Sequence, residues 1–168
     1  SGCTEPQPEL WEPAIIKSSD FQAEIERLSK LPTPNNGRRQ SWIVHPDSHK
    51  LGPGLGLAPG IRPILEVLNP GEQTAPIRHN STQVNFCIEG RGHSIIGGQR
   101  INFEQYDLWN FPSMQTYVHV NHTDKIQARL TYTNAPLLEK MNVHIVEENP
   151  LDNTENLKEI AKPIKDNI

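Results

Sequence analysis

One spacing pattern near the middle of the chain constrains its fold more than any other feature: Gly71-x5-Ile77-x-His79-x3-Gln83-x6-Gly90. Gly71 suits a tight turn that opens a strand, and Gly90 lies in the next turn. Side chains two residues apart on a strand point to the same side, so Ile77 and His79 should face one interior. Gln83 should reach the same interior from the neighbouring part of the hairpin. The pattern therefore predicts a hairpin that lines the inside of a β-structure.

Turn signals recur at roughly even intervals after residue 61, which is typical of an all-β domain. Gly97-Gly98 is a strong two-residue hairpin turn. The segments predicted as strands are 41–45, 62–69, 83–89, 93–96, 99–104, 107–111, 117–122 and 125–133.

The two ends of the chain differ from this β-rich middle. A short helix is predicted over Phe21–Leu31, with Ser19 and Gln22 as its capping box. Residues 135–146 should hold a short helix or turn and a last strand, and a weak helix is predicted over Thr154–Ala161. The predicted organisation is an N-terminal arm and helix over 1–40, a barrel over 41–149 and a tail over 150–168.

The central pattern resembles the first motif of the cupin barrels, in which two histidines stand at the places of Ile77 and His79 and a glutamate at the place of Gln83. The second cupin motif has its counterpart in Tyr106-x5-Pro112-x-Met114-x2-Tyr117-x3-Asn121, where the proline and the asparagine keep their places. Tyr106 and Met114 replace glycines, and Tyr117 replaces a third histidine. The resemblance implies an all-β cupin fold, a double-stranded β-helix or jelly-roll barrel, in which one metal ligand of four remains.

The resemblance is more specific over the stretch from Pro70 to Asn121, which looks like the gentisate and salicylate 1,2-dioxygenases, with a degraded metal-ligand motif. Those enzymes hold iron, commonly carry two cupin units, and have an arginine for the substrate carboxylate where this chain has Asn85. The runs that carry the likeness are Pro70-Gly71-Glu72, Ala75-Pro76, Arg78-His79, Phe86-x-Ile88-Glu89-Gly90, Asp107-Leu108, Phe111-Pro112 and Ala135-Pro136-Leu137.

The predicted catalytic residues are His79, Tyr117 and His119, acting as hydrogen-bonding or acid–base groups in a largely apolar pocket. No metal cofactor is expected, because two imidazoles are too few to hold a divalent ion firmly. The alternative is Fe(II) or another divalent metal held by His79, His119 and Tyr117. If no metal binds, Tyr117 should fill the metal position and form a hydrogen bond with His79.

Further side chains are predicted to contact a ligand, and each has an ordinary structural alternative. Ile77 can be a packed core residue, and the aromatic residues can simply fill the barrel. Arg62 and Arg129 offer bidentate contacts to a carboxylate, although salt-bridged arginines are commoner. The predicted ligand-contact residues are Ile77, Gln83, Asn85, Trp109 and Arg78. The remaining histidines show no ligand spacing and are expected in surface or loop positions; they are His45, His49, His93, His122 and His144.

Bulk properties narrow the possible partners. The net charge is −4, which argues against nucleic acid and anionic membranes. No apolar run is long enough for a membrane span, and the first residues lack a signal-peptide pattern. Two isolated cysteines form no disulfide framework, so the cytoplasm is the expected location. A homodimer is expected, because the arm 1–17 and the strand 41–45 are suited to reaching a second copy.

Three functions remain open at this point. The first function is that of a metal-poor cupin that binds a small organic ligand, as a sensor, carrier or non-oxidative enzyme. The second function is a non-haem Fe(II) dioxygenase with a rearranged ligand set, acting on an aromatic or other small carboxylate. The third is a structural or oligomerisation module whose barrel has lost its pocket.

Overall fold

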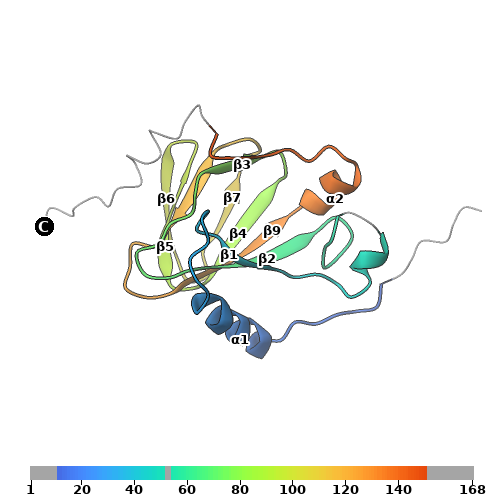
Figure 1. Ribbon diagram of the computed structural model, residues 1–168, viewed down its shortest axis with the longest axis horizontal. Coiled ribbons are helices and arrows are strands. Elements are labelled where there is room, and N and C mark those ends of the chain that lie inside the picture. The colour runs from blue at the N-terminus through green and yellow to red at the C-terminus, as the bar shows by residue number, and fades with distance from the viewer. Residues whose placement is uncertain (1–10, 52–53, 151–168) are drawn as a thin grey trace, which may run out of the picture.

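The computed structural model describes residues 11–51 and 54–150, and most of them belong to two facing antiparallel β-sheets of five strands each (Figure 1). The first sheet has the strand order β1-β2-β9-β4-β7 and the second has the order β10-β3-β8-β5-β6. The elements are α1 (Ser18–Ser29), β1 (Arg39–Trp42), a 3-10 helix (Ser48–Leu51), β2 (Arg62–Leu68), β3 (Ile77–His79), β4 (Gln83–Glu89), β5 (Arg91–Ile96), β6 (Gln99–Glu104), β7 (Leu108–Phe111), β8 (Tyr117–Val120), β9 (Gln127–Thr133), α2 (Ala135–Lys140) and β10 (Val146–Glu148).

This architecture confirms the predicted all-β cupin barrel with a short N-terminal helix. The hairpin at Gly97-Gly98 is also confirmed: both glycines have positive φ, 54° and 81°, and Ile96 pairs with Gln99 across the turn. Two successive positive φ angles match the right-handed twist of the flanking strands, and glycine adopts them without strain.

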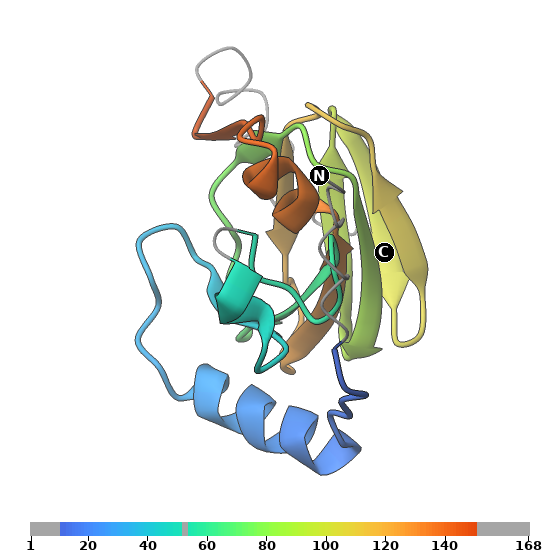
Figure 2. The same ribbon diagram turned by 90° about the vertical axis from the view of Figure 1, so that its right-hand side faces the viewer.

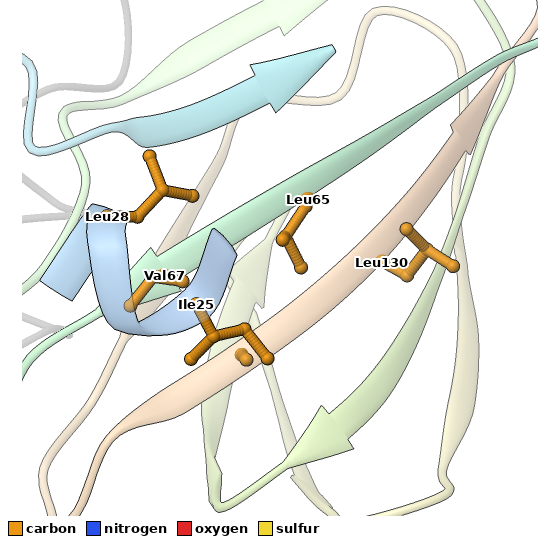
Figure 3. Close-up of a cluster of buried hydrophobic side chains, with 6 residues drawn as sticks. Ile25, Leu28, Leu65, Val67 and Leu130 are labelled. Carbon is orange, nitrogen blue, oxygen red and sulfur yellow. The ribbon is translucent and has the colours of Figure 1, made fainter. Parts of the chain in front are cut away.

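Helix α1 packs on the outer face of the first sheet, outside the barrel (Figure 2). Ile25 and Leu28 are buried against Leu65 and Val67 of β2 and against Leu130 of β9 (Figure 3). Alternation along β9 therefore gives its two faces different roles. The residues beside Arg129 pack beneath the helix, whereas Arg129 itself points into the barrel.

Helix α1 begins at Ser18, three residues before the predicted start at Phe21, and its predicted capping box is wrong. The N-cap is Lys17, whose backbone N–H donates to the carboxylate of Asp20 at 2.9 Å. An acidic side chain in the first turn is favourable because the helix dipole is positive there. Asp20 therefore supplies the polar contact that the sequence pattern assigned to Gln22.

Two turns keep a glycine-like backbone without glycine. Tyr106 and Met114, which replace motif glycines, have φ angles of 75° and 61°. Residues with a Cβ atom are strained in this region, so the turn geometry is maintained by the surrounding strands.

Strand limits differ from the predictions by a few residues. β5 begins at Arg91, β8 ends at Val120, and β1 spans Arg39–Trp42 where 41–45 was predicted. The last strand, β10, begins at the final residue of the predicted segment 135–146 and continues beyond it. The helix predicted over Thr154–Ala161 lies outside the described residues.

Candidate functional site

A hydrogen bond between His79 and Tyr117 lies at the centre of the candidate site. Ile77 of β3 lies opposite Tyr117 of β8, and alternation places His79 on the same side as Ile77. The His79 Nε2 atom is 3.0 Å from the Tyr117 hydroxyl oxygen, and the two rings meet edge to face. The sequence pattern predicted this contact for a barrel in which Tyr117 fills the metal position.

Burial controls the charge of both partners. Burial lowers the pKa of His79, and a hydrogen bond that the ring donates to the Ser81 backbone carbonyl opposes this shift because it favours the charged ring. Burial also raises the pKa of Tyr117 to about 12, and the Arg38 guanidinium only partly opposes this shift. At neutral pH the pair is therefore a neutral imidazole and a neutral phenol.

His119 is the second interior imidazole. Its side chain is fully buried, its Nδ1 atom lies 2.7 Å from the Ser94 hydroxyl oxygen, and its Nε2 atom has no protein partner. Burial holds the pKa of His119 well below its ordinary value, and Arg129 and Arg38 add to the effect. His119 is therefore a neutral ring with one nitrogen free for a ligand.

The rest of the polar interior is organised by Arg129, which is fully buried on β9. Its Nη1 atom lies 2.9 Å from the Glu66 carboxylate and 3.5 Å from the Asn85 side-chain oxygen, and its Nε atom donates to Gln127 at 2.9 Å. Thr131 also donates to the Asn85 oxygen, at 2.9 Å. A buried guanidinium is thus neutralised by one carboxylate and oriented by amide oxygens.

Several buried polar atoms of this interior have no hydrogen-bond partner among residues 11–51 and 54–150. Buried polar groups are almost always hydrogen-bonded, so such atoms indicate a place that a polar ligand or water can occupy. Asn85 lies opposite Trp109 on β7 and contacts Arg129, so three of these atoms belong to neighbouring residues. The unpartnered nitrogen atoms are Arg129 Nη2, Asn85 Nδ2, Trp109 Nε1, His119 Nε2 and Arg38 Nε, and Glu66 Oε2 likewise accepts no hydrogen bond although it faces Arg129.

Aromatic and aliphatic side chains lie directly beside these polar groups. Trp109 stacks on Phe103 with ring centroids 4.1 Å apart, and Phe111 packs against Tyr117 at 4.5 Å. Ile77 and Ile101 pack at the edge of this cluster. Aromatic walls with a few polar groups among them are the usual composition of a site for a small organic molecule.

Two predicted arginines lie apart from this group. Arg78 forms an ion pair with Glu147 of β10, and alternation along β3 directs it away from Ile77 and His79. Arg62 makes two hydrogen bonds to Glu139, at 2.9 and 2.6 Å, and stacks on Trp42. Both arginines therefore have structural partners.

Sequence reasoning missed His144, which lies beside His79 with ring centroids 6.5 Å apart and contacts the Ser81 hydroxyl. His144 precedes β10, and only the pairing of β10 with β3 brings it there. Arg38 was also missed, although its guanidinium lies 6.0 Å from the Tyr117 ring. No local pattern in the sequence predicts either contact.

The surface or loop position expected for His93 is wrong, because this residue is buried on β5, whereas His45 lies in a loop as expected but is also buried. His93 and His45 are only 1% and 6% exposed. His93 points into the packing between β5 and the loop after β8, where its Nδ1 atom meets His122 Nδ1 at 2.9 Å. His45 stacks on Trp11. Both rings are buried because an aromatic or imidazole neighbour from a distant part of the chain covers them.

The donor set fits poorly with the iron that the resemblance implies. Ile77 has no donor atom, and the Tyr117 phenol occupies the Nε2 face of His79 as a neutral group. Within residues 11–51 and 54–150, no three His, Cys, Asp or Glu side chains come together as a metal site. A divalent first-row ion needs several such donors acting together.

The fold is the barrel that the two cupin motifs predicted. Residues 64–134 match the family model described as the cupin domain. The structure also resembles a cupin 2 conserved barrel domain protein from Salinispora arenicola, with a TM-score of 0.53, 19% identity, and coverage of 73% of this chain and 89% of that one.

Two curated proteins similar to this chain are described as 1,2-dioxygenases of substituted salicylates. It is 28% identical over 158 residues to a 5-nitrosalicylic acid 1,2-dioxygenase from Bradyrhizobium sp, covering 93% of this chain and 72% of the relative. It is 25% identical to a 5-aminosalicylate 1,2-dioxygenase from Comamonas sp, covering 89% and 39% respectively. A variant of salicylate 1,2-dioxygenase from Pseudoaminobacter salicylatoxidans has a TM-score of 0.75 at 22% identity, covering 88% of this chain and 42% of that one.

The relatives differ in length, and the chain covers 72% of the Bradyrhizobium enzyme. The chain spans less than half of the Comamonas enzyme and of the solved salicylate 1,2-dioxygenase.

Neither helix in the described part of the chain is long and apolar enough to cross a membrane.

Proposed function

We propose that this cupin binds a small organic carboxylate inside its barrel, without iron, beside the His79–Tyr117 pair. The observation that carries the proposal is the group of unpartnered buried N–H donors on Arg129, Asn85 and Trp109. Hydrogen bonds from such donors to an ionised group are stronger than those to a neutral one.

The charges around the interior favour an anion. The guanidinium groups of Arg129 and Arg38 both influence His119, while Glu66 supplies one nearby carboxylate. Arg38 and Arg129 together leave an excess of one positive charge over Glu66. A carboxylate would balance this excess, and its hydrocarbon part would lie against the aromatic cluster of Trp109 and Phe111.

His79, Tyr117 and His119 would then act on the ligand as neutral hydrogen-bonding or acid–base groups. Ile77 and Gln83 complete the wall around the pair, and Gln83 forms a side-chain hydrogen bond with both His79 and Tyr117. This arrangement supports proton transfer or simple binding, and it requires no metal. The location that we propose for the protein is the cytoplasm.

The second candidate is a non-haem Fe(II) dioxygenase in which His79, His119 and Tyr117 form a rearranged ligand set. It is favoured by the names of the two curated relatives, both of which are described as 1,2-dioxygenases. Tyr117 would have to ionise on binding the metal, since a bound cation favours the charged form of its ligand.

Calorimetric titration with matched acids and amides tests the proposed function. Benzoate or salicylate should bind, whereas benzamide and salicylamide should bind at least about tenfold more weakly, because they lack the charge that Arg129 would pair with. Asn85→Asp should weaken binding of the acids by a similar factor, since the added carboxylate would occupy the Arg129 guanidinium.

Asn110→Asp is the matched control, because Asn110 is exposed on β7 and its substitution adds the same charge outside the barrel. Equal affinity for acids and amides, or equal losses in the two variants, would contradict the proposal.

Light scattering on the same samples measures the oligomeric state, for which we propose a homodimer.

A further inference from the structure

Five side chains form a continuous line of contacts from the barrel interior toward the surface. The Tyr117 hydroxyl oxygen lies 3.0 Å from His79 Nε2, and His79 Nδ1 lies 2.8 Å from the Ser81 hydroxyl oxygen. The Ser81 hydroxyl oxygen lies 3.2 Å from His144 Nε2. His144 Nδ1 lies 3.7 Å from a carboxylate oxygen of Glu139, which completes the line.

The line runs from buried side chains to partly solvent-exposed ones. Tyr117 and His79 are buried, while the side chains of His144 and Glu139 are 17% and 24% exposed. Each step is within hydrogen-bonding distance except the last, where the Glu139 carboxylate faces His144 Nδ1 at 3.7 Å.

The surroundings of His79 fix its tautomer. Its Nδ1 atom faces two oxygens of Ser81, the backbone carbonyl oxygen at 3.0 Å and the hydroxyl oxygen at 2.8 Å. A carbonyl oxygen can only accept, so Nδ1 must carry the ring proton. Because the neutral ring has a single N–H, Nε2 is bare and accepts the hydrogen bond of the Tyr117 hydroxyl.

The same reasoning continues outward. The Ser81 hydroxyl accepts from His79, so its own proton is directed to His144 Nε2, the other atom within reach. A neutral His144 then carries its proton on Nδ1, facing the Glu139 carboxylate. Every donor in the line therefore points from Tyr117 toward the surface.

The segment that carries His144 is held firmly against the barrel. The Asn80 side chain donates to the Val143 carbonyl at 2.8 Å and accepts from the Ile145 backbone at 2.9 Å, on either side of His144. Glu139 is fixed in turn by its two hydrogen bonds to Arg62. These contacts fix the outer half of the line as well as the inner half.

We propose that Tyr117, His79, Ser81 and His144 form a proton relay, which connects a ligand bound inside the barrel to solvent. This inference rests on the proposed binding site and adds a path for protons to it. Tyr117 is the catalytic residue that touches the ligand, and Ser81 and His144 are relay residues.

The transfer is balanced at every atom. A ligand proton moves to the Tyr117 oxygen while the Tyr117 proton moves to His79 Nε2. The His79 Nδ1 proton moves to the Ser81 oxygen, the Ser81 proton moves to His144 Nε2, and the His144 Nδ1 proton leaves to Glu139 or water. The ligand loses one proton and solvent gains one, and return of a proton along the same path restores the starting tautomers.

This path suits reactions that remove a proton from a ligand and return it at another atom. Tyr117 has no direct route to solvent because it is buried, and the relay supplies one. The nearby Arg38 guanidinium would stabilise a transient phenolate on Tyr117, since an opposite charge favours the ionised form.

Nitrogen-15 NMR of the ligand-free protein tests the relay independently of any ligand. The His79 ring should be observed with its proton on Nδ1, and that proton should exchange with water through Ser81 and His144. Ser81→Ala and His144→Ala should each slow this exchange by at least about tenfold, since each removes one step of a general acid–base path.

Added imidazole separates a relay from a merely structural role. It should restore fast exchange in the His144→Ala protein, where it can enter the space left at the surface, and should leave the Ser81→Ala protein slow. His49→Ala, at an exposed histidine away from the line, should change nothing. A proton on Nε2 of His79, unchanged exchange in both variants, or slowed exchange that imidazole fails to restore would each overturn the relay.

Discussion

Replacing Arg129 alone is expected to destabilise the protein by about 3–5 kcal/mol, because the substitution leaves the Glu66 carboxylate buried without its counter-ion. Glu66 and Arg129 are only 8% and 0% exposed, and their side chains lie 2.9 Å apart on the neighbouring strands β2 and β9. Arg129→Met keeps much of the side-chain volume, so the loss reports the broken ion pair more than a cavity.

The double variant Glu66→Leu, Arg129→Met is the decisive comparison. Removing both charges also removes the uncompensated one, so the double variant should be markedly more stable than either single variant. Urea unfolding of the four proteins gives the coupling between the two residues. Additive losses, with the double variant the least stable, would show that the ion pair does not organise the interior as described.

The second large effect is a loss of stability in mild acid. Burial lowers the pKa of four histidines, His79, His93, His119 and His144, and for His93 the value is about 4. The unfolded chain binds protons at these rings near pH 6.5, whereas the native protein does not. The stabilisation is therefore complete above pH 6.5 and falls as the pH drops toward 4.

The shift of His93 alone corresponds to about 2 kcal/mol lost between pH 7 and pH 5. Urea unfolding at the two pH values measures the loss, and the other three histidines should add to it. His93→Asn should lower stability at pH 7 but make the pH dependence shallower. A free energy of unfolding that is constant between pH 7 and pH 5 would contradict the buried, neutral state of these rings.

The sequence predicted those parts of the fold that depend on local spacing. Gly97-Gly98 fixes a hairpin by its backbone freedom alone, and alternation placed Ile77 and His79 on one face before any contact was known. The limits of α1 were less predictable, because Asp20 and Gln22 are both able to accept a hydrogen bond at a helix start.

The candidate site was predictable only in part, because several of its contacts depend on strand pairing and not on local spacing. His79 and Tyr117 lie in recognisable motifs, so their contact could be anticipated. His144 reaches His79 through the pairing of β10 with β3, and Arg129 meets Glu66 through the register of β2 and β9. Such contacts join residues far apart in the chain, and strand register across a barrel is not visible in a single sequence.

Burial of His93 illustrates the same limit. A histidine with no ligand spacing was expected at the surface, yet β5 is covered on both sides and His122 closes over the ring. The identity of a strand's neighbours decides whether its polar residues are buried. That information comes from the topology of the second sheet.

Metal analysis of the purified protein tests the central claim most directly, namely that Tyr117 fills the metal position and leaves a metal-free ligand site. The neutral phenol of Tyr117 lies against His79, and Ile77 offers no donor. We therefore expect no stoichiometric iron, manganese, nickel or zinc, and unchanged ligand binding after treatment with a chelator. Close to one equivalent of metal, lost on His79→Ala together with ligand binding, would contradict the account and favour the dioxygenase.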